Sequence, residues 1–371
     1  MKIYIDTVRR FVRPNNTDWR YNFILSELST IEPYLELYYP TSRLHEVKVN
    51  LAYCRDAVGY RLSRLARLPN LLAAETYSDT LCERELLDSS CEVVFSHRGF
   101  PVNARSLPVV WQNSILDPRM SLAHGISQSA LAHEISAKRI LFERAARVQV
   151  STHAEAARLG ALMPEIADRF IAVPFFLPYL EGIAEEAVRR KHSDPDCVHF
   201  VFVGREARRK GLPELLAALS QLDFGSRSGV RMTIVSDFRD GSIALPAWDN
   251  LRWHKSMPRR EVAALFDEAH VLLMPSRFES YGFVYLEAMS RGMVPVVPDW
   301  EVQRELVDNG SCGMVVGNDP VRIANAIEEL TVDTPHRSHL AMSAIRRFNA
   351  EYAPKVVASR YSRLFSDAIR A

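Results

Sequence analysis

The sequence predicts an α/β protein with two domains, each built on a parallel sheet with helices between its strands. Length favours two domains, because 371 residues exceed what a single hydrophobic core usually holds. Short runs of β-branched and aromatic residues alternate with amphipathic segments of helical length, which is typical of parallel α/β layering. A hydrophobic content of 47% suffices for two cores, and 25% charged residues is an ordinary value for globular proteins.

Strand and helix candidates follow one another along both halves of the chain. In the first domain, residues 1–175, we expect strands at 2–7, 46–51, 92–96, 108–111, 147–150 and 170–174, and helices at 20–30, 127–145 and 154–162. Residues 176–197 interrupt the alternation with prolines and charged residues, which indicates an interdomain linker. In the second domain, residues 198–354, we expect strands at 198–203, 231–235, 250–253, 270–274 and 294–297.

Composition indicates a cytoplasmic protein. The five cysteines are odd in number and lack the spacing of metal ligands, so we expect reduced thiols. The first residues predict a strand and lack the apolar centre of a signal peptide. No apolar run approaches the roughly 18 residues that a membrane helix needs. The net charge of +1 neither favours nor excludes an anionic partner.

The most informative segment is the turn at residues 275–287, where a predicted strand meets a predicted helix. Such a turn leaves several backbone N–H groups unpaired and directed at one place, which attracts phosphate and sugar oxygens. Gly282 allows a ligand to approach the backbone. Glu279 in the turn and Glu287 in the helix place carboxylates on either side of it. This pattern indicates a nucleotide-sugar site, and Glu305 in a following helix is a further ligand candidate.

A basic loop follows the first strand of the second domain. Gly204 and Gly211 flank it, and Arg205 and Lys210 lie between them, just before a predicted helix at 212–222. At the carboxyl edge of an open α/β sheet these two cations can neutralise a diphosphate. A solvated basic loop explains the residues equally well when the loop is considered alone. The second site at 275–287 favours the ligand-binding interpretation.

Taken together and in order, these motifs resemble the retaining glycosyltransferases of family four. The matching pattern is Gly-Arg-x4-Lys-Gly, then Pro-Ser-x2-Glu-Ser-x-Gly-x4-Glu-Ala-Met-x2-Gly, then a Pro-Val strand and Glu-Leu-Val-x2-Gly. The resemblance is strong over residues 198–317 and looser before them. It implies a GT-B fold, in which two Rossmann-like domains face each other across a cleft and the second holds the donor. It also implies that the helix at 355–371 returns to the first domain.

The resemblance assigns roles in the donor site residue by residue. Arg205 and Lys210 would hold the donor diphosphate beside Gly204. Glu279 would accept hydrogen bonds from hydroxyl groups of the transferred sugar, and Glu287 would bind the ribose hydroxyls. The remaining donor contacts would come from the backbone N–H groups of Ser280, Tyr281, Gly282 and Phe283 and from the segment of His254 beside the base.

A mechanism follows from the same resemblance. The sugar would pass with retention, by a front-face route, from a UDP- or GDP-sugar to a hydroxyl acceptor, and the leaving diphosphate would take the acceptor proton. Arg205 and Lys210 would stabilise the leaving group, so no metal or cofactor is expected. Glycoside hydrolysis by a carboxylate pair does not fit, because Glu279 and Glu287 are about two helical turns apart. We therefore assign Glu279, Arg205 and Lys210 as the catalytic residues.

The first domain departs from the family pattern where the acceptor should bind. Its first strand-to-helix loop lacks the family's glycine pair, and Arg13, Asn16 and Trp19 in this loop are candidates for acceptor contacts. The family often carries a histidine after the Pro-Val strand of this domain, where Asn113 stands here. His97 is the other candidate for a sugar contact, although a lone histidine at a strand end is more often structural.

The sequence also leads to expectations about the acceptor, about membrane contact and about alternative functions. The acceptor would be a glycan or a lipid-linked saccharide of polysaccharide biosynthesis, without nucleic acid. Residues 60–68 repeat basic and apolar side chains and could meet the inner membrane face, while an ordinary surface helix is the favoured interpretation. A catalytically silent protein that binds a nucleotide sugar or a partner is the alternative function. A nucleotide-sugar epimerase of the same architecture is a weaker alternative.

Overall fold

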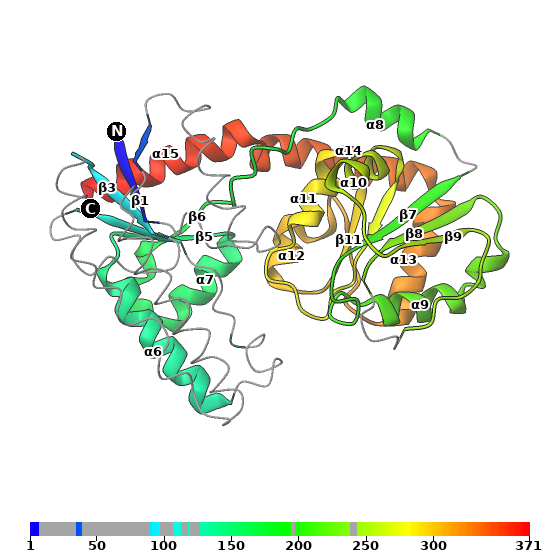
Figure 1. Cartoon of the computed structure of the whole chain (residues 1–371), viewed down its shortest axis with the longest axis horizontal. Coiled ribbons are helices and arrows are strands. Elements are labelled where there is room, and N and C mark those ends of the chain that lie inside the picture. Colours follow the sequence, from blue (N-terminus) through cyan, green and yellow to red (C-terminus); the bar gives the residue numbers. More distant parts are fainter. Residues whose placement is uncertain are drawn as a thin grey trace. The chain divides into compact units, whose positions relative to one another are not determined.

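The computed structural model describes residues 1–6, 35–38, 90–96, 107–112, 118, 127–193, 197–237 and 243–371. The chain divides into two compact units (Figure 1). Unit 1 comprises Met1–Pro178 and Val357–Ala371, and unit 2 comprises Tyr179–Val356. The strand expected at 46–51, the helix expected at 20–30 and the basic segment 60–68 lie outside the described residues. Among the helices that are described, none is long and apolar enough to cross a membrane.

Unit 1 contains a parallel sheet of six strands in the order β2-β1-β3-β4-β5-β6. Its centre is almost entirely apolar, because a parallel sheet covered on both faces has no solvated side. Four of the expected strands are confirmed with shifts of a few residues at most, and β6 ends earlier than expected. The strands are β1 (Lys2–Asp6), β2 (Glu36–Tyr38), β3 (Val93–Ser96), β4 (Val109–Gln112), β5 (Arg147–Val150) and β6 (Phe170–Ala172).

Two groups of helices cover the unit 1 sheet on opposite faces. Helices α6 (Gln128–Arg144) and α7 (His153–Leu162) pack on one face, where Phe142 contacts the rings of Trp111 and Phe170. The C-terminal helix α15 (Pro354–Arg370) packs on the other face, where Phe365 lies edge-on to Phe95 with 5.7 Å between ring centroids. The buried amide of Gln112 donates a 3.1 Å hydrogen bond to the Tyr361 hydroxyl of α15. Helix α15 is therefore an integral part of unit 1.

Unit 2 contains a second parallel sheet of six strands, in the order β12-β11-β10-β7-β8-β9. The expected strands of this domain are all present, and β7 and β11 have the predicted bounds. Strand β7 is followed directly by Gly204 and β11 by Pro298, which makes their boundaries clear. The strands are β7 (Val198–Val203), β8 (Val230–Val235), β9 (Leu251–His254), β10 (Val271–Leu273), β11 (Val294–Val297) and β12 (Met314–Val315).

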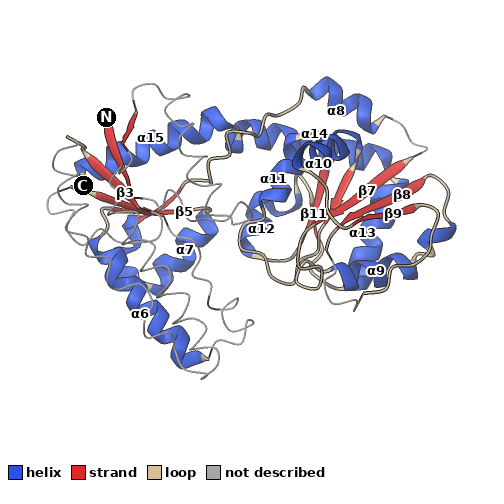
Figure 2. Cartoon of the chain, viewed as in Figure 1, coloured by secondary structure: helices blue, strands red, loops and turns tan. Residues whose placement is uncertain are grey.

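Helices cover both faces of the unit 2 sheet, as Figure 2 shows. Helix α9 packs against α13 on one face, and α8 and α11 pack against α14 on the other. Helix α8 lies within residues 176–197, so part of the segment expected as a linker is folded onto unit 2. The helices are α8 (Glu185–His192), α9 (Leu212–Gln221), α10 (Arg259–Glu268), α11 (Phe283–Ser290), α12 (Glu301–Leu306), α13 (Pro320–Val332) and α14 (Thr334–Arg347).

Candidate nucleotide-sugar site

The carboxyl edge of the unit 2 sheet brings together the residues that the sequence singled out. Strands β7, β8 and β9 run parallel in a register that pairs Val203 with Val235 and Val235 with His254. Gly204 therefore leaves the sheet at the same edge at which His254 ends β9. Strand β10 is parallel to β7 on its other side, so the turn that begins at Pro275 also opens at this edge. Open α/β sheets bind their ligands at such an edge.

The loop between β7 and α9 is held by its backbone at both ends. The Gly204 N–H donates to the carbonyl of Val235 at 3.0 Å, and the Ser236 hydroxyl donates to the Gly204 carbonyl at 2.6 Å. Gly211 ends the loop with φ of +83°, a conformation that only glycine adopts readily. A Cβ atom there would collide with the carbonyl of Pro275. Gly211 thus allows the two site loops to lie against each other.

The turn between β10 and α11 directs N–H groups outward. Gly282 precedes α11 with φ of +85° and offers no side chain to cap the helix. Beneath the turn, the fully buried Tyr285 donates its hydroxyl to the Met274 carbonyl at 2.8 Å. Among the described residues, the N–H groups of Ser280 and Gly282 find no hydrogen-bond acceptor. With the positive end of the α11 dipole, these groups form an anion-binding corner.

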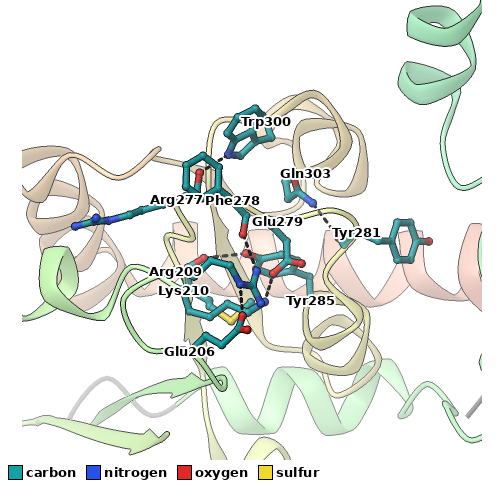
Figure 3. A network of polar contacts seen from close by, with 11 residues as sticks. Glu206, Arg209, Lys210, Arg277, Phe278, Glu279, Tyr281, Tyr285, Trp300 and Gln303 are labelled. Carbon is teal, nitrogen blue, oxygen red and sulfur yellow. Dashed lines mark hydrogen bonds and ion pairs between the residues drawn. The ribbon is translucent and has the colours of Figure 1, made fainter. Parts of the chain in front are cut away.

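Several side chains tie the two loops to each other. Arg209 donates to the Phe278 carbonyl at 2.9 Å, and its own carbonyl accepts the Arg277 N–H at 2.9 Å (Figure 3). Arg277 in turn donates to Glu214 of α9 at 2.7 Å. The Arg209 guanidinium therefore fixes the backbone of the other loop, and the Arg277 guanidinium ties that loop to α9.

Lys210 and Glu279 form an ion pair at the centre of the site, as Figure 3 shows. The Lys210 side chain is 12% exposed and that of Glu279 only 6%. Burial lowers the pKa of the Lys210 ammonium below its usual range, and the Glu279 carboxylate partly opposes this. The pair holds a positive and a negative group next to the N–H groups of the turn. A diphosphate and a sugar hydroxyl require these two types of group.

The other predicted donor residues also lie along this edge. Arg205 is exposed and pairs with none of the described residues, so its guanidinium is available to a ligand. His254 is half-buried at the end of β9. Glu287 lies in the second turn of α11, where the Tyr179 hydroxyl and Arg259 contact its carboxylate. The segment of Ser280, Tyr281, Gly282 and Phe283 forms the turn itself.

Some candidates do not join this group. Glu305 lies in α12, and its main-chain carbonyl accepts a 2.7 Å hydrogen bond from Arg347 of α14. The acceptor-side candidates Arg13, Asn16, Trp19, His97 and Asn113 lie outside the described residues.

The sequence did not single out four residues that shape the site. Trp300 donates to the Arg277 carbonyl at 3.1 Å, and the buried Gln303 donates to the Tyr281 carbonyl at 2.9 Å. Both support the turn from the start of α12. Tyr179 and Arg259 contact Glu287 from other elements. A cation at the first position of a helix is a signal that could have drawn attention to Arg259, whereas the burial of Gln303 is visible only in the structure.

Comparison with known proteins identifies the family of this domain. Residues 184–347 match the family model of the group 1 glycosyl transferases. A curated relative, the D-inositol 3-phosphate glycosyltransferase of Thermobifida fusca, is 26% identical over 309 residues, covering 75% of this chain and 70% of the relative. The chain spans about half the length of most of the curated relatives that it matches.

Solved structures share the fold of the whole chain. Sucrose-phosphate synthase of Thermosynechococcus elongatus has a TM-score of 0.68 at 14% identity, covering 100% of this chain and 99% of that protein. The HepE protein of Anabaena in complex with UDP-glucose has a TM-score of 0.62 at 13% identity, covering 98% and 99%. The predicted GT-B fold is confirmed. Residues 184–347 belong to the group 1 glycosyl transferases, and the whole chain has the GT-B fold.

Proposed function

We propose that this protein transfers a sugar from a nucleoside-diphosphate sugar to a hydroxyl acceptor, with retention and without a metal ion. The observation that carries the proposal is the buried Lys210–Glu279 pair beside the outward N–H groups of Ser280 and Gly282. A diphosphate needs a cation and N–H donors, and a sugar needs a hydrogen-bond acceptor. The loop before α9 supplies the cation, and the turn before α11 supplies the N–H donors and the acceptor, so two adjoining loops provide all of them.

The proposed reaction breaks the bond between the sugar C1 and a β-phosphate oxygen. Lys210, Arg205 and the amino end of α11 stabilise the negative charge that develops on the leaving diphosphate. A new bond forms between C1 and the acceptor oxygen on the same face of the sugar. The acceptor proton passes to the leaving phosphate oxygen. Glu279 accepts hydrogen bonds from sugar hydroxyls and orients C1 for this step.

The base of the donor nucleotide and the identity of the acceptor are to be found by screening. HepE was solved with UDP-glucose, and this supports testing UDP-sugars first, with GDP-sugars second. The name of the curated relatives adds D-inositol 3-phosphate to the glycans and lipid-linked saccharides considered as acceptors. Thermal shift with UDP, GDP, ADP and dTDP finds the base, because a ligand that binds only the folded state stabilises it.

Acceptor-dependent release of nucleoside diphosphate tests the proposal. We expect release from the matching donor when acceptor is added, a product with the anomeric configuration of the donor, and the same rate in EDTA. Glu279→Ala should lose the release. The control is Glu186→Ala on the exposed face of α8, which should keep it.

Two outcomes would favour one of the alternative functions. Stabilisation by a nucleoside diphosphate without release for any acceptor would favour a silent binding protein. Conversion of the donor sugar to an epimer without acceptor would favour an epimerase. Unchanged release in Glu279→Ala would overturn the assigned site.

A further inference from the structure

Glu287 is held by two side chains from distant parts of unit 2. The Tyr179 hydroxyl donates to Glu287 Oε1 at 3.3 Å, and Arg259 Nη2 lies 3.6 Å from the same oxygen. The Arg259 guanidinium also covers the Tyr179 ring, with 3.3 Å between its Cζ and the ring centroid. The three side chains therefore form a closed set, in which each contacts the other two.

The side chains of the three residues differ in their exposure to solvent, and this gives them different roles. The Glu287 side chain is 25% exposed, so a ligand can reach it, and Arg259 is 56% exposed. Tyr179 is half-buried, and burial together with the Glu287 charge raises the pKa of its phenol well above the usual range. The phenol therefore stays protonated and donates to the carboxylate at any physiological pH.

The elements that carry this set converge on the ligand edge of the sheet. Arg259 is the first residue of α10, five positions after His254 at the carboxyl end of β9. Glu287 lies in the second turn of α11, the helix that begins at the anion-binding corner. Tyr179 stands in a turn before α8, and 108 residues separate it from Glu287.

A glutamate side chain has several rotatable bonds, and a ligand that needs one rotamer must immobilise them. Two contacts on Oε1 restrict that freedom before any ligand arrives. The stacked Arg259 cannot move without losing its contact with the Tyr179 ring, which adds to the restraint. Preorganisation of this kind raises affinity without a new contact to the ligand.

We propose that Tyr179 and Arg259 are positioning residues that fix the Glu287 carboxylate to recognise the ribose hydroxyls of the donor nucleotide. This inference rests on the proposed function, since it names how that same site selects a ribonucleotide. Tyr179 and Arg259 do not touch the donor in this account. They set how strongly the site distinguishes a ribose from a deoxyribose.

The test compares the affinities of UDP and 2′-deoxy-UDP for the full chain by calorimetry, or those of the GDP pair if GDP is the stabilising nucleotide. We expect the wild-type protein to bind the ribonucleotide about tenfold more tightly, since a site built to bond a hydroxyl rejects the analogue that lacks it. Tyr179→Phe and Arg259→Met should each reduce this ratio to about threefold or less. Arg259→Lys should keep part of it.

The variants are chosen so that folding does not decide the outcome. Tyr179→Phe keeps the ring under Arg259, and Arg259 is an exposed residue at a helix start. Arg260→Met removes the neighbouring exposed cation of α10 and should keep the wild-type ratio. A purely structural role would change both affinities by the same factor and leave the ratio unchanged.

Each result has a distinct meaning. If the wild-type protein binds no nucleoside diphosphate, the proposed function fails, and if it binds both nucleotides equally, the ribose role of Glu287 fails. If the wild-type protein discriminates and both variants keep its ratio, the positioning role alone is overturned. Tighter ribonucleotide binding by Arg259→Met would also overturn it, because Arg259 would then compete with the ribose for Glu287.

Discussion

The two ends of the unit 2 sheet differ in how their buried polar groups are bonded. At the amino end, His192, His199 and His270 are buried, and each uses a ring nitrogen in a hydrogen bond of 2.8 or 2.9 Å. At the carboxyl end, Lys210 and Glu279 share one ion pair beside N–H groups that lack acceptors among the described residues. At the amino end each histidine ring is bonded within the protein through at least one nitrogen, although Nδ1 of His192 and Nδ1 of His199 find no partner among the described residues. At the carboxyl end the polar groups are a charged pair and N–H groups that lack acceptors among the described residues.

Neutral groups at one end and charged groups at the other explain this difference. His270 accepts the His199 N–H on Nδ1 at 3.1 Å and donates Nε2–H to the Lys191 carbonyl, so the bonding pattern requires a neutral ring. These bonds attach α8 to the base of the sheet, which is a structural task. An ion pair can exchange partners with a charged ligand, and neutral histidines bonded to backbone carbonyls and to the Thr233 hydroxyl cannot. Stability and function are thus separated along the strands.

Acidification is expected to have the largest effect, and to act through the amino end. Burial lowers the pKa of His192 and His199 to about 3 and that of His270 to about 4, and the cationic Lys191, Arg231 and Arg337 contribute. The unfolded chain titrates near pH 6.5 and therefore holds more protons below it, so the free energy of unfolding decreases as the pH falls. At pH 5 the loss is about 2 kcal/mol for each histidine, measurable by urea unfolding.

Two variants locate that acid effect. His192→Gln keeps a donor for the Gly292 carbonyl and removes one titrating group, so its stability should depend less steeply on pH. Ser280→Ala, at the carboxyl end, removes no titrating group and should leave the pH dependence unchanged. Equal slopes for all three proteins would contradict the separation of the two ends.

Loss of the Lys210 ammonium should have the largest effect on activity. Lys210→Ala removes the buried cation of the proposed leaving-group site, and we expect transfer to slow about 100- to 1000-fold. It also leaves Glu279 buried without its partner, which costs about 3–5 kcal/mol of stability. The double variant Lys210→Met with Glu279→Gln should recover stability without activity. Arg190→Ala on α8 should behave as the wild type, and near-normal transfer by Lys210→Ala would refute the role.

A side chain at Gly211 should have an intermediate effect. Gly211→Ala forces a residue with a Cβ into φ of +83° and against the Pro275 carbonyl, with a cost of about 1–3 kcal/mol in backbone strain and further displacement of the loops. Donor affinity should fall with stability, because the loops that hold Lys210 and Glu279 separate. Gly310→Ala is the matched control, since Gly310 has φ of +108° and a Cβ added there would meet no described atom within 4 Å. Equal donor affinity in both variants would show that the loop contact is dispensable.

Substitution of Arg205 should have the smallest effect, and this effect should be confined to the affinity for the donor. Its side chain is exposed, so Arg205→Gln should leave the melting temperature unchanged. We expect donor affinity to fall about three- to tenfold at low salt, and less at high salt, because ions screen an exposed charge. Titrations at two salt concentrations measure this, with Arg363→Gln on α15 as control. A salt-independent loss would point to a contact other than charge.

The sequence predicted the parts of the fold and site that depend on local patterns. Strand β7 was predicted to the residue because a mostly apolar, β-branched and aromatic run ends at Gly204. The turn before α11 was predicted because a predicted strand meets a predicted helix there, with Gly282 between them. Such a turn leaves backbone N–H groups unpaired, and this predicted that it binds an anion. Strands β2 and β12, of three and two residues, are too short for a periodic signal and were missed. The contact of Tyr179 with Glu287 joins residues 108 positions apart, and no local pattern encodes it.

The return of α15 to unit 1 has a consequence for synthesis of the protein. Unit 1 needs Val357–Ala371, whose Tyr361 and Phe365 are buried against its sheet, while unit 2 occupies the chain between its two parts. Domains fold as units while the ribosome delivers the chain from its N-terminus. Unit 2 is therefore fully delivered before unit 1, although unit 1 is begun first. The apolar face that α15 covers stays open until α15 has been synthesised, and during that interval it is a surface for chaperones.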